Sequence, residues 1–528
     1  MNLNAEQKIA VTHDSDSLAI MAGAGSGKTT VLLQRAVHET TRMGVNRVLL
    51  LAFTRAAAKE MATRLDATLP MAVRAQVQVA TIHGHAHQLL RRYGAGNLGK
   101  EFSVIDGEDE KVIEREAKAT GVNPADVRKR ARLLRYGDLL PLALQVLHAQ
   151  REEHGGSILV DEAQDLTHEE WCYIASLRPS RLTAVGDCAQ AIFGWRGGIP
   201  DFPQKMRTML RSWTVTVDLR INYRSVDGIL NLANRLEIPG KVALRGVRGD
   251  DGRRSFMVLP TDETIYIRDD WKVDGSTAIL ARTKAVLMSV YEALTAAGVP
   301  VHAPSLTGQI WNSEEGRTIL DMLQVVANPH STLHLSRVLR KVCQWSGRML
   351  DEAEEGRAKI ACSMWDYLCA TLPGDSDDAA LLRYLHSLRG LQATAEQAVE
   401  GLAKWLGWLA DGARVPVPAD LSVPEFLEWL ASPNREEAEA PEGAVVLSTI
   451  HGAKGREWDN VILLGCEEGI LPITRKASDI EEERRLFYVA ITRAKDQLVL
   501  SHCQRRTQAW GRGVREMQAS RFLQEVGL

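Results

Sequence analysis

The sequence lacks the features that mark several classes of protein. Its seven cysteines are scattered and include no C-x-x-C pair, which predicts a reducing compartment without disulfides, zinc or an iron–sulfur cluster. No apolar run approaches the roughly 20 residues that a membrane-spanning helix needs. Residues Met1–Gln7 have neither a basic start nor an apolar core, so we expect no signal peptide. These absences predict a cytoplasmic protein with no membrane partner.

An excess of charge of either sign is also missing. The chain carries 64 Lys and Arg residues against 67 Asp and Glu residues, a net charge of −3. Proteins that coat duplex DNA through phosphate contacts are usually basic. Any nucleic acid is therefore expected in a local groove, held by base stacking and a limited set of phosphate contacts.

What is present is an alternation of apolar strands and helical segments in a chain of 528 residues, too long for one hydrophobic core. This alternation predicts an α/β fold with parallel sheets. The strand candidates are residues 18–22, 47–53, 77–82, 157–161, 181–186, 214–218, 277–281, 444–449, 460–464 and 496–501. We expect two α/β lobes, residues 1–90 with 141–213 and residues 214–330 with 440–528, each carrying a helical insertion, 91–140 and 331–439.

A glycine-rich loop between an apolar strand and a helix indicates a nucleoside triphosphate site. In such a loop, backbone N–H groups surround phosphates, a lysine reaches the β and γ phosphates, and a hydroxyl holds Mg²⁺. Lys28 and Thr29 fit these two roles, while Ala22 occupies the first position of the motif, where glycine is usual. The loop residues predicted to bind nucleotide are Ala24, Gly25, Ser26, Gly27, Lys28, Thr29 and Thr30.

Two adjacent carboxylates follow the strand candidate 157–161. Hydrolysis of a phosphoanhydride needs one carboxylate for Mg²⁺ and one residue that orients the attacking water. We assign Asp161 to the first role and Glu162 to the second. The alternative interpretation is a solvated acidic turn after a buried strand. The presence of the phosphate loop in the same chain disfavours this alternative.

Further polar and aromatic residues follow two more strands and the helical run near the C-terminus. Gln190 could contact the γ phosphate or the attacking water, and Arg224 and Arg493 could stabilise charge in the transition state. A lone arginine is more often part of a surface ion pair. Phe193 and Trp195, beside Arg196, suit stacking on unpaired bases, and the alternative is an aromatic pair in a core.

Taken in order, the motifs resemble those of superfamily 1 DNA helicases of the UvrD/Rep/PcrA type. They are Asn4–Gln7, Ala22–Thr30, Ala52–Met61, Thr81–Gly84, Val160–Asp165, Val185–Gly197, Asn222–Ser225, Ser448–Glu457 and Glu482–Ala494. The resemblance spans nearly the whole chain outside the two insertions. It implies two RecA-like P-loop NTPase lobes with ATP and Mg²⁺ bound between them.

The same resemblance implies roles for individual residues. Gln7 would read adenine, Tyr223 would stack on it, Glu457 would touch the ribose with Gly455 nearby, and Arg224 and Arg493 would meet the γ phosphate. The positions that match the family's single-strand groove are Phe53, Thr54, Arg55, His83, Phe193, Trp195, Arg196, Thr449, His451 and Trp510.

Some features depart from the pattern or have more than one interpretation. Thr30 stands where relatives often have Arg, and the two insertions, which usually hold duplex contacts, are short for the family. His83, His85 and His87 form an H-x-H-x-H pattern, but a metal site there is a poor prediction at this low specificity. The arginine-rich stretch 128–135 fits either duplex phosphates or a solvated helix face.

The expected function is therefore an ATP-dependent DNA helicase that acts on single-stranded DNA and on junctions with duplex DNA. The resemblance implies travel in the 3′→5′ direction and a protein that is monomeric or weakly self-associating. Two alternatives stay open: a translocase that strips proteins from single strands but unwinds weakly, and a non-motor protein whose DNA affinity is switched by ATP. The segment after Arg493 is too short for a nuclease domain, so we do not expect a helicase–nuclease fusion.

Overall fold

A computed structural model describes most of the chain. The described residues are 3–150, 154–210, 213–249, 254–259, 275–303, 306, 311, 314–328, 331, 334–335, 337–338, 341, 381, 384–385, 387–388, 394–405, 421–431, 440, 443–473, 480–507 and 514–528. The chain folds into two compact units. The first unit comprises Met1–Ile82, Glu152–Thr307 and Glu436–Leu528, and the second comprises His83–Arg151 and Gly308–Arg435.

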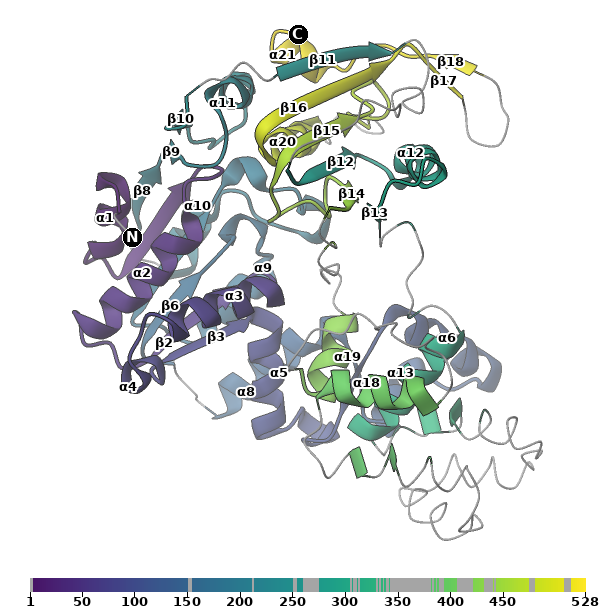
Figure 1. Cartoon of the computed structure of the whole chain (residues 1–528). Helices are drawn as coiled ribbons and strands as arrows, with labels where there is room; N and C mark the ends of the chain where they lie inside the picture. The colour runs from purple at the N-terminus through teal and green to yellow at the C-terminus, as the bar shows by residue number, and fades with distance from the viewer. Residues whose placement is uncertain are drawn as a thin grey trace. The chain divides into compact units, whose positions relative to one another are not determined.

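The first unit holds two six-stranded sheets, each built from parallel pairs (Figure 1). The order in the first sheet is β3-β2-β6-β7-β1-β8. Its strands are β1 (Ser17–Ala22), β2 (Val48–Ala52), β3 (Val77–Thr81), β6 (Ser157–Val160), β7 (Arg181–Gly186) and β8 (Val215–Leu219). The central strands β1, β2 and β6 are buried along their whole length, as their unbroken apolar runs require.

Helices cover the first sheet. Among them are α1 (Ala5–Thr12), α2 (Lys28–Thr41), α3 (Arg55–Asp66), α4 (Met71–Arg74), α9 (His168–Ser176) and α10 (Phe202–Leu210). Helices α2 and α3 pack on β2 and α10 packs on β1. Residues from α1, α2 and α3, including Val31, Leu32 and Met61, form one core with the apolar side chains of the strands.

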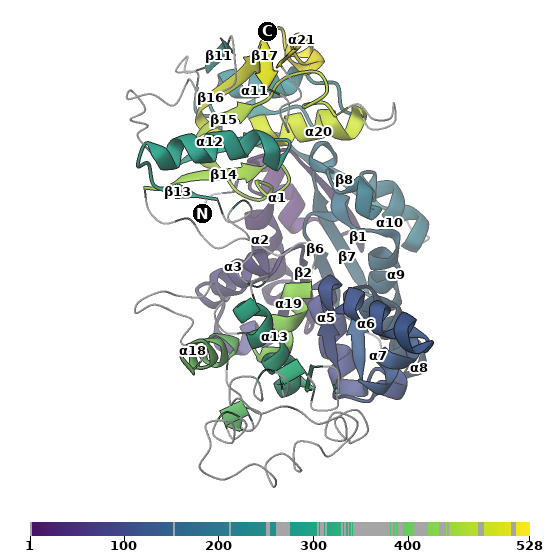
Figure 2. The ribbon, with the colours of Figure 1, turned by 90° about the vertical axis from the view of Figure 1, so that its right-hand side faces the viewer.

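The second sheet has the order β11-β16-β15-β12-β14-β13. Its strands are β11 (Arg254–Leu259), β12 (Thr277–Ala281), β13 (Val301–His302), β14 (Val445–Thr449), β15 (Trp458–Leu464) and β16 (Ala494–Cys503). Helix α12 (Lys284–Ala296) lies along β14 (Figure 2). Helices α11 (Asp227–Arg235) and α20 (Ile480–Ile491) belong to a core that includes Trp458 and Leu498 and is different from that of α12. The short elements β9 (Ile221–Asn222), β10 (Arg245–Gly246), β17 (Arg505–Thr507), β18 (Val514–Glu516) and α21 (Arg521–Glu525) complete this part of the first unit.

All ten strands expected from the sequence are present, and the α/β class with parallel sheets is confirmed. One assignment is wrong: the strand expected at 214–218 as the start of the second lobe is β8, which pairs with β1 in the first sheet. Its alternating sequence VTVDL indicates a half-buried edge strand but carries no information on which sheet it joins.

The second unit joins the two insertions. From its first segment come α5 (Ile82–Tyr93), β4 (Ser103–Ile105), α6 (Gly107–Thr120), α7 (Pro124–Arg130), β5 (Leu133–Arg135) and α8 (Leu139–Gln150), and from its second come α13 (Glu314–Ala327), α18 (Ala395–Trp405) and α19 (Val423–Ala431). Helices α13, α18 and α19 share one core, in which Phe426 packs on Trp311 and Trp429. Gln324 donates to the backbone oxygen of Val104 at 2.9 Å. Most of α5, like α8 and α13, was expected in the lobes but lies in this unit. Strands β4 and β5 form a small parallel sheet inside the first insertion.

None of the helices within the described ranges is both long and apolar enough to span a bilayer.

Candidate functional site

The phosphate loop joins β1 to α2 and has the backbone that anion binding requires. Gly25 and Gly27 have φ angles of 65° and 80°, a region that side chains rarely adopt. A Cβ atom on Gly25 would lie 2.6 Å from Nδ2 of Asn222, so this position also needs glycine for space. Among the described residues, α2 has Gly27 as its N-cap and no side-chain cap, which leaves this end of the helix suited to phosphate oxygens.

The acidic pair lies at the end of β6, next to the phosphate loop. Nζ of Lys28 is 3.5 Å from Oε1 of Glu162. Burial and the neighbouring Glu162 charge raise the pKa of Asp161. Burial also acts to raise the pKa of Glu162, but Lys28 and Lys454 outweigh it and hold that pKa low. In this pair, burial and a like charge therefore disfavour ionisation of Asp161, whereas the lysine charges keep Glu162 ionised.

These residues fit a divalent cation with a nucleotide. Asp161 is 5% exposed and carries a carboxyl group whose charged form is penalised by burial and by Glu162. A cation beside it would favour that charged form. Thr29 lies in the first turn of α2, and α2 contacts β6, whose last residue, Val160, immediately precedes Asp161. The two residues predicted to hold Mg²⁺ thus lie at the ends of neighbouring elements.

Arg493 connects the second sheet to the first. It follows α20, and its Nη2 donates to Oε1 of Gln190 at 2.9 Å, in the 3-10 helix η4 (Cys188–Gln190) that follows β7. Gln190 in turn donates through Nε2 to Asp187 at 2.7 Å. Burial, and then Arg224, lower the pKa of Arg493 to about 9. Among the described residues, its guanidinium donates to neutral oxygens of Gln190, Val489, Arg456 and Thr492. A buried guanidinium with neutral acceptors is suited to receive an anion.

Two further predicted residues meet near the loop. Nε of Arg224 lies 2.5 Å from Oε2 of Glu457, and Nη1 donates to the backbone oxygen of Thr492 at 3.1 Å. Glu457 immediately precedes β15, so this ion pair links the segment after β9 to the second sheet. The pair places Arg224 close to the Arg493 segment.

The predicted adenine residues also converge on the phosphate loop. Gln7 and Asn4 form a capping box at the start of α1, and Nε2 of Gln7 donates to the backbone oxygen of Ser26 at 3.0 Å. Nδ2 of Asn4 donates to the hydroxyl of Tyr223 at 2.8 Å, and Tyr223 is 45% exposed. The backbone N–H of Tyr223 donates to Gly25 at 2.9 Å. An exposed aromatic ring therefore stands beside the loop, as a stacking role requires.

Four predicted DNA-binding residues form a group that we call the aromatic cluster: Phe53, Phe193, Trp195 and His451. Phe193 is central, with ring centroids 5.5 Å from Phe53, 6.4 Å from Trp195 and 6.2 Å from His451. Trp195 is 65% exposed. The Arg196 guanidinium lies 5.8 Å from the Phe53 centroid. The cluster thus combines elements of both sheets with aromatic faces and positive charge.

The remaining predicted residues lie elsewhere or have structural contacts. Thr54 caps α3 by accepting from the N–H of Ala57, and Arg55 is the first residue of that helix. Thr449 ends β14 and its hydroxyl accepts from Gly452, while Gly455 has a φ of 81° in the following loop. His83 stacks on Tyr136 in the second unit. Trp510 lies outside the described residues.

Sequence reasoning assigned no role to Lys454, Gln164 or Asp165, which connect the cluster and the acidic pair. Gln164 donates to Glu162 at 2.5 Å and accepts from the N–H of Asp187 at 3.0 Å. Lys454 forms an ion pair with Asp165. These residues lie within motifs that we quoted, but a motif does not reveal which of its polar side chains bond to one another.

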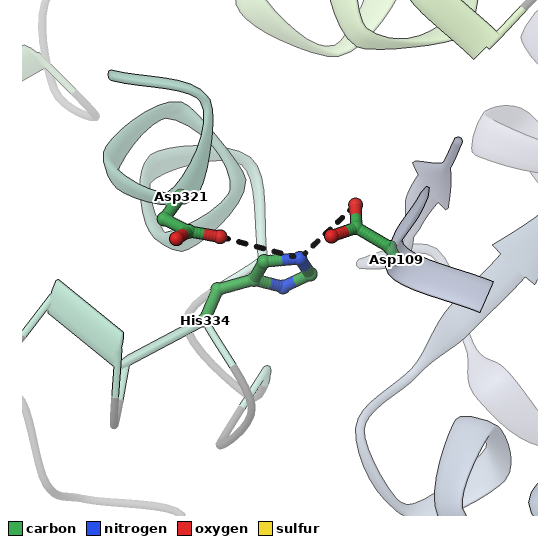
Figure 3. Close-up of side chains that lie close together, drawn as sticks. All are labelled: Asp109, Asp321 and His334. Atoms are coloured by element: carbon green, nitrogen blue, oxygen red, sulfur yellow. Dashed lines mark ion pairs between the residues drawn. The ribbon is translucent and has the colours of Figure 1, made fainter. Parts of the chain in front are cut away.

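A separate polar group lies in the second unit: Asp109, Asp321 and His334 (Figure 3). Nε2 of His334 is 3.4 Å from Asp109 and 4.0 Å from Asp321. The carboxylates already accept from guanidinium groups: Arg337 is 2.9 Å from Asp109 and 3.0 Å from Asp321, and Arg317 is 2.8 Å from Asp109. Asp106 also contacts Arg317, at 2.5 Å. In total, three carboxylates face two guanidinium groups and one imidazole. This balance of negative and positive groups fits an ion network that joins the insertions better than it fits a metal site.

Comparisons with known proteins identify the family of the chain. The UvrD/REP helicase N-terminal domain family matches residues 3–135 and 126–210, and the UvrD-like helicase C-terminal domain family matches residues 395–505. The chain is 27% identical to the ATP-dependent DNA helicase PcrA of Leuconostoc citreum over 99% of this chain and 84% of that protein. It is 26% identical to DNA helicase II of Escherichia coli strain K12 over 99% of this chain and 87% of that protein. The chain belongs to the UvrD-like helicase family of superfamily 1.

Proposed function

We propose that this protein is an ATP-hydrolysing DNA helicase that moves along single-stranded DNA in the 3′→5′ direction. The observation that carries the proposal is the contact between Arg493 and Gln190. It brings a buried cation from the side of the second sheet to the residues that follow β7 in the first sheet. In a motor, the state of the nucleotide must be read by both lobes, and this contact offers the means.

Each residue near the phosphate loop has a distinct task in this proposal. Lys28 and the N-terminus of α2 bind the β and γ phosphates, and Glu162, ionised by its lysine neighbours, orients the attacking water. Arg493 and Arg224 stabilise the charge that develops on the γ phosphate. Mg²⁺, held by Thr29 and Asp161, would neutralise phosphate charge during the transfer.

The aromatic cluster is the proposed contact with single-stranded DNA. Bases stack on aromatic faces without regard to sequence, and Arg196 supplies a cation for the backbone. Phe53 follows β2 of the first sheet, and His451 follows β14 of the second sheet. Motion between the two sheets would therefore change the distance between these rings. Repeated changes of that kind would move the strand past the protein.

The ATPase half of the proposal is tested by Lys28→Ala. We expect ATP hydrolysis to fall at least about 100-fold, because the lysine that contacts the phosphates is lost. Binding of labelled single-stranded DNA should persist. Lys284→Ala, at an exposed position at the start of α12, is the control and should hydrolyse ATP as the wild type does. Undiminished hydrolysis by the Lys28 variant would rule out the assignment of this loop.

A further inference from the structure

Lys454 has contacts with both the aromatic cluster and the acidic side of the nucleotide site. It lies in the loop between β14 and β15, and its side chain is 8% exposed. Its Nζ donates to the backbone oxygen of Gln190 at 2.7 Å and to the carboxylate of Asp165. The same atom lies 5.0 Å from the Phe193 centroid and 6.0 Å from the Phe53 centroid.

The position of this ammonium group depends on both sets of partners. A buried lysine is stable only when its charge is compensated, and the fully buried Asp165 provides the carboxylate. The two ring faces add attraction of the cation–π type, which depends on where each ring stands. A shift of Phe193 or Phe53 therefore changes the forces on Nζ directly.

From Asp165 the contacts continue to the residue that we assign to water activation. Nε2 of Gln164 lies 3.2 Å from Oδ2 of Asp165 and 2.5 Å from Oε2 of Glu162. Gln190, whose backbone oxygen binds Lys454, accepts from Arg493 through its side chain. A displacement of Nζ thus reaches Glu162 through one path and Arg493 through another, each through directly bonded groups.

We propose that Lys454 is a positioning residue that couples stacking of bases on the aromatic cluster to the rate of ATP hydrolysis. The inference rests on the proposed function of the site. Bases that stack on Phe193 or Phe53 shift the rings, Lys454 follows, and Asp165 and Gln164 bring Glu162 into the geometry that orients water. Lys454 itself touches neither the phosphates nor the attacking water in this scheme.

The test is the ratio of kcat with saturating oligo(dT) to kcat without DNA. Lys454→Met keeps the length and apolar packing of the side chain but removes its charge, and we expect it to lower this ratio at least about tenfold. The affinity for oligo(dT), measured by fluorescence anisotropy, should fall less than the ratio does. The control is Lys241→Met, which removes a partly buried lysine whose Nζ donates to the backbone oxygens of Ala233 and Asn234. It should keep the wild-type ratio.

The outcomes separate this inference from the proposed function. If the wild type shows no stimulation by DNA, the proposed function itself fails. If the wild type is stimulated and Lys454→Met keeps the same ratio, with both rates lowered equally, Lys454 is merely structural and the inference is overturned. If Lys454→Met folds poorly, Asp165→Asn tests the same path, because it removes the charge that Lys454 contacts. Both changes interrupt one path. The variant that combines Lys454→Met and Asp165→Asn should therefore have a stimulation ratio no lower than that of the more impaired single variant.

Discussion

At the scale of single residues, burial determines which groups titrate near neutral pH. His451 is an example: burial, and then Arg282 and Lys454, lower its pKa to about 4. An imidazole in the unfolded chain has a pKa of about 6.5. The folded protein therefore holds His451 neutral over a range of pH in which the unfolded chain would protonate it.

This difference predicts a pH-dependent stability term. The stabilisation that comes from keeping His451 neutral in the folded state is fully present above about pH 6.5 and is lost as the pH falls through about 4, worth roughly 3 kcal/mol. Urea unfolding of wild type and His451→Asn between pH 7 and pH 4 measures it. The wild type should lose more stability than the variant over this range. The control is His148→Asn, at an exposed position at the end of α8. Parallel curves for wild type and His451→Asn would contradict the assignment.

At the scale of elements, the ion network joins α6 to α13 in the second unit. Asp109 is buried and accepts from Arg317 and Arg337. Burial acts to raise the pKa of Asp109, but His334, Arg317 and Arg337 outweigh it and hold the pKa well below its usual range. Its stabilising contribution is present above the pKa of an unfolded Asp, about 4, and is lost as the pH falls below that value.

Removing the Asp109 charge should destabilise the second unit. Asp109→Asn leaves two partly buried guanidinium groups with less compensation, and we expect a loss of about 3 kcal/mol. Thermal unfolding followed by circular dichroism detects it, and Glu114→Gln, an exposed change on the same helix, is the control.

EDTA should leave the unfolding temperature of the wild type unchanged, because arginines rather than a metal ion satisfy these carboxylates. A transition lowered by EDTA would identify the cluster as a metal site.

At the scale of the whole molecule, the direction and strength of unwinding separate the helicase from its alternatives. Partial duplexes with either a 3′ or a 5′ single-stranded tail, incubated with ATP, should be unwound only from the 3′ tail. ATP-driven removal of a bound protein from single strands, with little unwinding, would favour the translocase instead. Stimulated hydrolysis without movement would favour the ATP-switched DNA-binding protein.

The sequence predicted local structure better than long-range partners. Strands such as β1 and β6 are continuous apolar runs, and the polar residues after parallel strands gather at one sheet edge, so the acidic pair and the phosphate loop could be placed together. The sheet to which β8 belongs depends on hydrogen bonds across the chain, which periodicity does not encode. The contacts of Lys454 likewise depend on where two distant loops meet. The same holds for the ion network, whose residues come from two insertions.

The order of the strands along the chain has a consequence for folding during synthesis. Every strand of the first sheet lies between Ser17 and Leu219, whereas the second sheet pairs β11, at Arg254–Leu259, with β16, at Ala494–Cys503. Pairing across so long a loop is slow and must wait for the later segment. A ribosome that has exposed the first 250 or so residues therefore presents a sheet with all its strands, while Arg493 has yet to be made. Protease resistance should arise first in the nucleotide-binding half, well before the chain can hydrolyse ATP.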